Sequence, residues 1–458
     1  MFEDDTIAAI STALGEGGIG IVRISGKAAF EIADSVFRSA RGKVPSHLPS
    51  HSIIHGEIID PATGSTIDEV LLSAMRAPNT YTREDTVEIN CHGGMLPLRK
   101  VLDLILEKGA RMANPGEFTQ RAFINGRIDL VQAEAVMDVI RSKTDASRKV
   151  ALEQLSGGLS GEITDIRDIL MNICAHIEAY LDFPEDEIEM ETEVSLMERT
   201  SGLLMRLDRL YDTYEDGRFF REGLSVAIVG RPNVGKSSLL NTLLERDRAI
   251  VTDIPGTTRD VIEEYLNVSG LPVRVIDTAG IRESHDAPEQ EGVKRSLRAI
   301  DEADLVLAIF DGSDELHDDD LRVIERLKSK NTVHVLNKSD LGISASNYEM
   351  MAGEKPVKIS AKLGEGIEDL KEAILKRALR GDTEMTEGIM VTNIRHRISI
   401  GRARDAIMRG LESFKEKRPL EVVTVDLRDA LQNLGEIIGT VTTEDILNRI
   451  FDEFCIGK

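Results

Sequence analysis

The segment Gly230–Ser237 reads GRPNVGKS, and it is the part of the chain best suited to bind phosphate. Its glycines let backbone N–H groups turn toward one point, and a helix starting at its end adds partial positive charge. Lys236 can reach the β- and γ-phosphates of a nucleoside triphosphate, and Ser237 can ligate Mg²⁺. The apolar run Val226–Val229 precedes this segment and an amphipathic stretch follows it, as a P-loop requires. The expected phosphate-binding residues are Asn233, Val234, Gly235, Lys236, Ser237 and Ser238.

Three further motifs follow the P-loop in the order of a guanine-nucleotide site. Asp277-Thr278-Ala279-Gly280 closes an apolar run and offers a carboxylate near Mg²⁺ and an amide near the γ-phosphate. Asn337-Lys338-Ser339-Asp340 closes a later run, and its last carboxylate can accept both donors of the guanine edge, which adenine lacks. Ser360-Ala361-Lys362 offers backbone amides to guanine O6. All four motifs follow strands, where a doubly wound sheet binds ligands, so we predict a GTP site.

The residues between these motifs suggest the catalytic details. Thr258 lies in a candidate switch loop and is the expected second Mg²⁺ ligand. Ile281 follows the DTAG motif, where Ras-type enzymes have a glutamine that orients water, so another of the polar residues of segment 282–289 must do this. The side-chain oxygen of Asn233 could hold a monovalent cation in place of an arginine finger, or Asn233 could be only a turn former.

The elements that must position this site alternate between apolar runs and helical stretches from about residue 222 to 382. We expect a buried parallel sheet with helices on both faces. The expected strands are Ser225–Val229, Val273–Ile276, Leu305–Phe310 and Val333–Leu336. The expected helices are Lys236–Leu244, Glu291–Ile300, Leu321–Leu327 and Ile367–Ala378.

The flanking regions have two other patterns. Residues 1–117 contain short strand-like runs such as Gly17–Ile24 and Ser52–Ile59, with a helix over Lys100–Lys108, which predicts an α+β domain. Residues 118–221 and 383–458 have a helical period. The final segment forms a thin core alone, so we predict one α-helical domain split by the inserted α/β domain. Four sequential domains are the alternative.

Composition limits the class of protein. The 458 residues carry a formal net charge of −24, with a mean hydropathy of −0.16, as expected for a globular chain that does not coat nucleic acid or membranes non-specifically. Three distant cysteines exclude a disulfide framework and a CxxC zinc site. The acidic start lacks the order of a signal peptide, and no apolar run reaches membrane-spanning length, so we expect a cytoplasmic protein.

Motifs spread over the full length resemble the MnmE (TrmE) family of tRNA modification GTPases. Besides the P-loop, they are Gly17–Gly26, Tyr81–Asp85, Cys91–Gly94, Pro115–Thr119 and the terminal Cys455–Lys458. The resemblance implies a K⁺ ion held by Asn233, Thr252, Ile254 and Thr257, with Ile254 acting through its backbone. It implies nucleotide contacts from a switch loop of Thr252, Asp253, Ile254, Pro255, Gly256, Thr257 and Thr258. It also implies that Glu289 orients the catalytic water and that two G domains meet across the nucleotides.

The resemblance further implies that the N-terminal domain binds a tetrahydrofolate derivative of the 5-formyl or methylene type and forms a homodimer. The matching positions are Arg23, Glu88, Arg127 and Lys458, although the family often has lysine where this chain has Arg127. Cys455 matches a reactive thiol of the family. From the residues alone, Arg23 and Glu88 are equally well explained as an ordinary ion pair.

Two functions are weighed on these grounds. The resemblance implies a GTP-hydrolysing protein that acts with an MnmG-like FAD protein on tRNA and places an aminomethyl-type group, such as carboxymethylaminomethyl, on C5 of the wobble uridine U34. The alternative is an Era-like GTPase switch in ribosome assembly. That alternative requires an RNA-binding module, and the C-terminal segment offers only one basic cluster, whose members are Arg395, His396, Arg397, Arg402, Arg404 and Arg409.

Overall fold

The computed structural model describes residues 5–182, 192–247, 249, 264–276, 298–344, 355–379 and 388–458. The chain divides into two compact units. Of the described residues, the first unit contains 5–137 and 438–458, and the second contains those from 138 to 437. None of the helices in these ranges combines the length and apolar character needed to cross a lipid bilayer.

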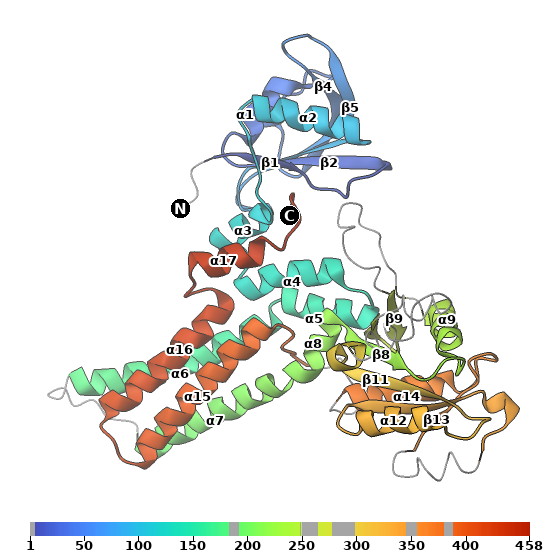
Figure 1. Ribbon diagram of the computed structural model, residues 1–458. Helices are drawn as coiled ribbons and strands as arrows, with labels where there is room; N and C mark the ends of the chain where they lie inside the picture. The colour runs from blue at the N-terminus through green and yellow to red at the C-terminus, as the bar shows by residue number, and fades with distance from the viewer. Residues whose placement is uncertain are drawn as a thin grey trace. The chain divides into compact units, whose positions relative to one another are not determined.

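The first unit is built on a seven-stranded sheet of order β3-β4-β5-β6-β2-β1-β7, antiparallel except for the β1–β7 pair. The strands are β1 (Ile7–Ile10), β2 (Gly17–Ser25), β3 (Phe37–Arg38), β4 (Ser52–Ile59), β5 (Thr66–Met75), β6 (Thr86–Gly93) and β7 (Arg111–Met112). Helices α1 (Ala29–Val36) and α2 (Met95–Glu107) pack together on the sheet (Figure 1), and η1 is Pro45–His47. The α2 helix begins before the expected Lys100, at Met95.

Both ends of the chain contribute to the first unit. Three helices follow the sheet: α3 (Glu117–Ile124), α4 (Leu130–Arg141) and, from the far end of the sequence, α17 (Glu444–Phe451). Helix α17 packs against α3 (Figure 1). Phe451 and Phe454 pack against Leu130 and Met137 in a small core. The last residues therefore lie on the same unit as the first strand, 450 residues away in sequence, because aromatic burial holds them there.

The second unit contains a helical part whose members lie on both sides of the α/β domain in sequence. The helices before it are α5 (Asp145–Leu155), α6 (Gly158–Asp182), α7 (Glu193–Asp212) and α8 (Tyr214–Glu222). Those after it are α15 (Ile394–Lys415) and α16 (Leu420–Ile438). Helix α15 packs along α7 (Figure 1), which confirms the expected helical domain split by an insertion.

The inserted domain has a six-stranded sheet of order β13-β12-β11-β8-β10-β9. Its strands are β8 (Leu224–Val229), β9 (Glu264–Val268), β10 (Leu271–Ile276), β11 (Leu305–Asp311), β12 (Thr332–Asn337) and β13 (Val357–Lys358). Its helices are α9 (Lys236–Asp247), α12 (Asp318–Leu327) and α14 (Ile367–Ala378), with η2 at Ser339–Leu341. The helix expected over Glu291–Ile300 lies mostly outside the described residues.

The expectation of a wholly parallel sheet is wrong at one edge. Strand β9 runs antiparallel to β10, whereas the other pairs of this sheet are parallel. The sequence hides β9 because Glu264, Tyr265 and Asn267 interrupt its apolar residues. Edge strands are exposed on one side and do not need a continuous apolar run.

Candidate functional site

The P-loop connects the end of β8 with the start of α9, as expected. Gly230 and Gly235 have positive φ angles of 151° and 100°. A Cβ on Gly230 would overlap the carbonyl oxygen of Ile309, and one on Gly235 would overlap the side-chain nitrogen Nδ2 of Asn337. Only glycine therefore lets this loop lie against the neighbouring strands β11 and β12.

Lys236 is the first residue of α9, and its side chain extends back over this loop. Its Nζ donates hydrogen bonds to the carbonyl oxygens of Gly230 (2.8 Å) and Arg231 (2.9 Å). Burial lowers the pKa of Lys236, because a partly dehydrated ammonium is less stable. A triphosphate would offer this ammonium oxygens with full negative charge, so the loop is arranged to favour an anion.

The other P-loop residues divide by accessibility. Val234 is buried in the core, whereas Asn233, Ser237 and Ser238 are exposed at the start of α9. Asn233 has a φ of 65°, which places it in the left-handed region that asparagine tolerates. Its side chain is thus accessible to a ligand, and its backbone also shapes the turn.

The guanine-recognition motifs meet the P-loop through Asn337, which is 3% exposed. Its Nδ2 donates to the carbonyl oxygen of Val234 (2.8 Å), and its Oδ1 accepts from the amide of Ala361 (2.9 Å). Asp340 Oδ1 accepts a hydrogen bond from Ser360 Oγ (2.7 Å), while Lys362 is exposed. The structure therefore brings three of the four expected motifs together, at the C-terminal ends of β8, β12 and β13.

The sequence analysis did not identify Asp311 as a partner of Lys338 in this region. Lys338, at a φ of 63°, donates from Nζ to Asp311 Oδ2 at 2.6 Å. Burial raises the pKa of Asp311, but hydrogen bonds from Lys338 and Ser313 outweigh it and lower the pKa overall. The position of Asp311 directly after the apolar strand β11 was the available signal.

The remaining expected residues of the nucleotide site lie outside the described residues. They are Thr252, Asp253, Ile254, Pro255, Gly256, Thr257, Thr258, Asp277, Thr278, Ala279, Gly280 and Glu289. Within the described ranges, no group of three His, Cys, Asp or Glu side chains could hold a metal. An exposed Ser237 hydroxyl next to a phosphate-binding loop fits Mg²⁺, because that ion is bound by few protein ligands together with phosphate oxygens.

A second candidate site lies in the first unit. It contains the four residues expected to bind a tetrahydrofolate derivative, namely Arg23, Glu88, Arg127 and Lys458. Arg23 and Glu88 face each other on β2 and β6, and Arg23 Nε donates to Glu88 Oε1 at 2.8 Å. The Arg23 guanidinium also lies 5.5 Å from the ring centroid of Phe118 and 6.0 Å from that of Tyr81. The pair is thus an ion pair, as the residues alone suggested, and it also has an aromatic lining.

Arg127 also contacts this tyrosine. Its guanidinium is 4.8 Å from the ring centroid of Tyr81, and its Nη1 donates to the Tyr81 carbonyl oxygen at 2.9 Å. The Tyr81 hydroxyl is 2.9 Å from the Thr119 hydroxyl. Neither Tyr81 nor Phe118 was expected as a site residue, although they lie in the motifs Tyr81–Asp85 and Pro115–Thr119 singled out from the sequence.

The C-terminal tail completes this site. The Phe118 amide donates to the Lys458 carbonyl oxygen (3.2 Å), and Arg23 Nη1 donates to that of Gly457 (3.4 Å). Burial and the neighbouring Arg23 lower the pKa of Lys458. Cys455 is exposed, and its carbonyl oxygen accepts from the amide of Gly116. Two guanidinium groups beside aromatic rings, with Lys458 close to Arg23, fit a flat ligand with carboxylates.

The basic cluster of the C-terminal helices does not form an open cationic face. Arg395 donates to the carbonyl oxygens of Glu436 and Ile437, and His396 is fully buried. Three further arginines form ion pairs at 2.6 to 2.8 Å, namely Arg397 with Glu215, Arg404 with Asp208 and Arg409 with Asp429. Arg402 is exposed. Most of this cluster therefore joins helices to one another.

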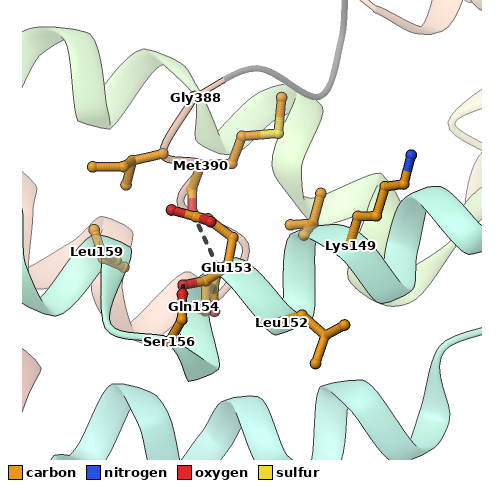
Figure 2. A pocket seen from close by; sticks show the side chains of 10 residues that line it. Lys149, Leu152, Glu153, Gln154, Ser156, Leu159, Gly388 and Met390 are labelled. Atoms are coloured by element: carbon orange, nitrogen blue, oxygen red, sulfur yellow. Dashed lines mark hydrogen bonds between the residues drawn. The ribbon is translucent and has the colours of Figure 1, made fainter.

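A separate hollow of about 540 Å³ lies along α5 and residues 388–390 (Figure 2). It is lined by Lys149, Glu153, Ser156, Leu159 and Met390, among others. It shares no residue with the P-loop or the Arg23 site. Its lining also lacks the cluster of cationic groups that a nucleoside triphosphate or a folate carboxylate would need.

Comparison with known proteins covers the whole chain. A family model described as "MnmE helical domain" matches residues 130–455, and one described as "GTP-binding protein TrmE N-terminus" matches residues 6–127. Proteins named tRNA modification GTPase MnmE are 48% identical in Alkaliphilus oremlandii and 47% identical in Clostridioides difficile, each over 100% of both chains. Among solved structures, the G domain of the FeoB iron transporter of T. maritima is 28% identical, with a TM-score of 0.26, over 34% of this chain and 99% of that one.

Proposed function

The chain belongs to the MnmE family of tRNA modification GTPases, and on that premise we propose that it hydrolyses GTP in the course of modifying tRNA. The observation that carries the proposal is the joining of the P-loop to both guanine-recognition motifs through Asn337. This arrangement suits a guanine nucleotide, because the P-loop would bind its phosphates and Asp340 would accept hydrogen bonds from its base.

In the proposed hydrolysis, Lys236 would bind the β- and γ-phosphates, and Ser237 and Thr258 would hold Mg²⁺, which when bound would supply positive charge to the phosphates. Asn233, with Thr252, Ile254 and Thr257, would hold K⁺, whose charge takes the place of an arginine finger. The exposed side chain of Asn233 supports this role. Glu289 orients the attacking water, because Ile281 cannot do so.

We further propose that the first unit binds a tetrahydrofolate derivative that supplies a one-carbon group. Arg23, Arg127 and Lys458 would bind the carboxylates of its glutamate tail, and Glu88 would accept from its pterin ring. The support is the gathering of these groups around Tyr81 and Phe118. Cys455, exposed beside Lys458, is the proposed reactive thiol of this site.

The finer assignments complete the proposal. The protein would act as a homodimer with an MnmG-like FAD protein and modify C5 of the wobble uridine U34 in the cytoplasm. Its proposed domains are 1–117, 118–221, 222–382 and 383–458, the second and fourth forming one helical domain. The ion-paired state of the basic cluster gives no support to an Era-like ribosome-assembly switch.

Mass spectrometry of tRNA nucleosides from a deletion strain tests this function. We expect the modified wobble uridine to disappear and to return when the gene is supplied in trans. A chain with Lys236→Ala should not restore it, whereas Lys358→Ala, on the exposed edge strand, should. Unchanged nucleosides in the deletion strain, together with GTP hydrolysis by the purified protein, would point instead to the ribosome-assembly reading.

A further inference from the structure

The connection between β11 and α12 (residues 311–320) lies beside the guanine-recognition motif. It consists of the end of β11, a loop and the first turn of α12. The Gly312 amide donates to the carbonyl oxygen of Asn337 at 2.7 Å, and a Cβ on Gly312 would lie 2.9 Å from that oxygen. The two backbones are therefore in direct contact, and Asn337 in turn bonds to the P-loop through Val234.

Asp311 begins this connection and holds Lys338. Its Oδ2 accepts from Lys338 Nζ at 2.6 Å, and its Oδ1 accepts from the amide and the hydroxyl of Ser313 at 3.0 and 2.7 Å. The Asp311 side chain is 12% exposed, so this charge-assisted hydrogen bond is largely shielded from water. Because both carboxylate oxygens are engaged, Asp311 fixes the Lys338 side chain, which belongs to the same motif as the proposed guanine acceptor Asp340.

The far end of the connection holds Arg231 of the P-loop. Arg231 Nη2 donates to Asp314 Oδ2 at 3.0 Å, and Arg231 Nε lies 3.3 Å from Asp320 Oδ2. The Asp320 side chain is 2% exposed, and its Oδ2 also accepts from the His317 amide at 3.1 Å. A carboxylate buried to this degree needs an opposite charge beside it, so Arg231 and Asp320 hold each other in place.

Arg231 links this ion pair to the phosphate-binding lysine. Its carbonyl oxygen accepts from Lys236 Nζ at 2.9 Å, while its side chain contacts the connection. Pro232 follows and restricts the backbone of both residues, so the positions of the Arg231 side chain and carbonyl are coupled. The P-loop pattern itself requires only Gly230, Gly235, Lys236 and a serine or threonine, and it leaves position 231 open. The connection therefore supplies a physical reason for an arginine at this position.

We propose that Asp311 and Asp320 are positioning residues for guanine-nucleotide binding. Asp311 orients Lys338 in the base-recognition motif, and Asp320 holds the P-loop through Arg231, so one connection sets both ends of the nucleotide site. This inference rests on the proposed GTPase function. It adds two carboxylates that act through neighbouring cations, and it requires only contacts within the α/β domain.

Paired substitutions separate this role from a general loss of stability. Asp311→Asn and Asp320→Asn keep the shape of each side chain and remove its charge. Lys338→Met and Arg231→Met remove the partner charges but keep an apolar stem. The double variants Asp311→Asn/Lys338→Met and Asp320→Asn/Arg231→Met complete two double-mutant cycles. Asp318→Asn is the matched control, because it removes the same charge from an exposed position of the same connection.

Equilibrium binding of the fluorescent nucleotide N-methylanthraniloyl-GDP to the full-length variants gives the result, with melting temperatures measured without nucleotide. We expect Asp311→Asn and Asp320→Asn each to weaken binding about tenfold, the effect of one hydrogen bond to a charged group, and Asp318→Asn to keep the wild-type affinity. Each double variant should bind no more weakly than its methionine variant alone.

If Asp320→Asn does not fold, Asp314→Asn tests the same Arg231 contact at an exposed position, with an expected loss of about threefold. Wild-type affinity in the folded aspartate variants, or additive losses in either cycle, would overturn the proposal. A wild-type protein that does not bind the fluorescent nucleotide would instead refute the guanine-nucleotide site itself.

Discussion

Gly457 lies in a position that only glycine can occupy, and its replacement should detach the C-terminal tail from the Arg23 site. Its φ is 98°, and a Cβ there would overlap the carbonyl oxygen of Ile10 and lie 2.9 Å from its carbonyl carbon. The same Cβ would be 3.0 Å from the Cα of Ser11. Because backbone atoms of β1 cannot yield as a flexible side chain would, Gly457→Ala must move the tail.

The magnitude follows from what the tail carries. Moving it displaces the ammonium of Lys458, whose proposed contact with a ligand carboxylate is worth about 1.5–3 kcal/mol as a charge-assisted hydrogen bond. That loss corresponds to binding of a folate derivative that is roughly 10- to 100-fold weaker. The fold should persist, because the core formed by Phe451 and Phe454 lies before the tail.

Calorimetric titration with 5-formyltetrahydrofolate measures the effect. Gly457→Ala should weaken binding at least as much as Lys458→Ala, because it moves the Lys458 side chain together with the Gly457 carbonyl that accepts from Arg23, and the double variant should be no worse than Gly457→Ala. Gly17→Ala is the matched control, since a Cβ at Gly17 has no atom within 4 Å. Wild-type affinity in Gly457→Ala would refute this reasoning, and absence of binding by the wild type would refute the proposed ligand.

Three further predictions concern the nucleotide site. Asn337→Ala should lower both the melting temperature and GTP affinity relative to Asn331→Ala, because it leaves the Val234 carbonyl and the Ala361 amide without their side-chain partner, at about 1–3 kcal/mol for each buried group. GTP turnover should be faster in K⁺ than in Na⁺, and Asn233→Ala should abolish the difference; equal wild-type rates in both salts would exclude the cation role. Glu289→Ala should reduce hydrolysis at least tenfold while nucleotide affinity stays nearly constant, and normal hydrolysis would remove Glu289 from the mechanism.

Much of the fold was predictable because the strands that carry the nucleotide site are buried on both faces. Strands β8, β11 and β12 are mostly apolar, with only His334 interrupting the run Val333–Leu336, and polar residues after each run mark its C-terminal end. Strand β9 was not predictable in this way, since Tyr265 and Asn267 break its run at the sheet edge. A continuous apolar run marks a strand only where both of its faces are buried, and β9 has an exposed residue, Asn267, at the edge of the sheet.

The contacts that assemble the sites could not be predicted from spacing. Val234 and Asn337 are 103 residues apart, and Arg23 and Gly457 are 434 apart. Neither pair belongs to a local motif, and each depends on the approach of two whole elements. Family resemblance supplied Arg23 and Lys458 as ligands, but only the structure shows that Tyr81 lies close to both Arg23 and Arg127.

The net charge of −24 is compatible with three anionic ligands because positive charge acts locally. Lys236 lies over the P-loop, and Lys458 lies close to Arg23, so each proposed small ligand would meet a local cationic group. A tRNA backbone needs an extended cationic surface instead. Arg397, Arg404 and Arg409, which could have formed one, are paired with carboxylates. We therefore predict that most phosphate contacts with tRNA come from the proposed flavoprotein partner, and that binding of tRNA by this chain alone is weak and falls only slightly with salt.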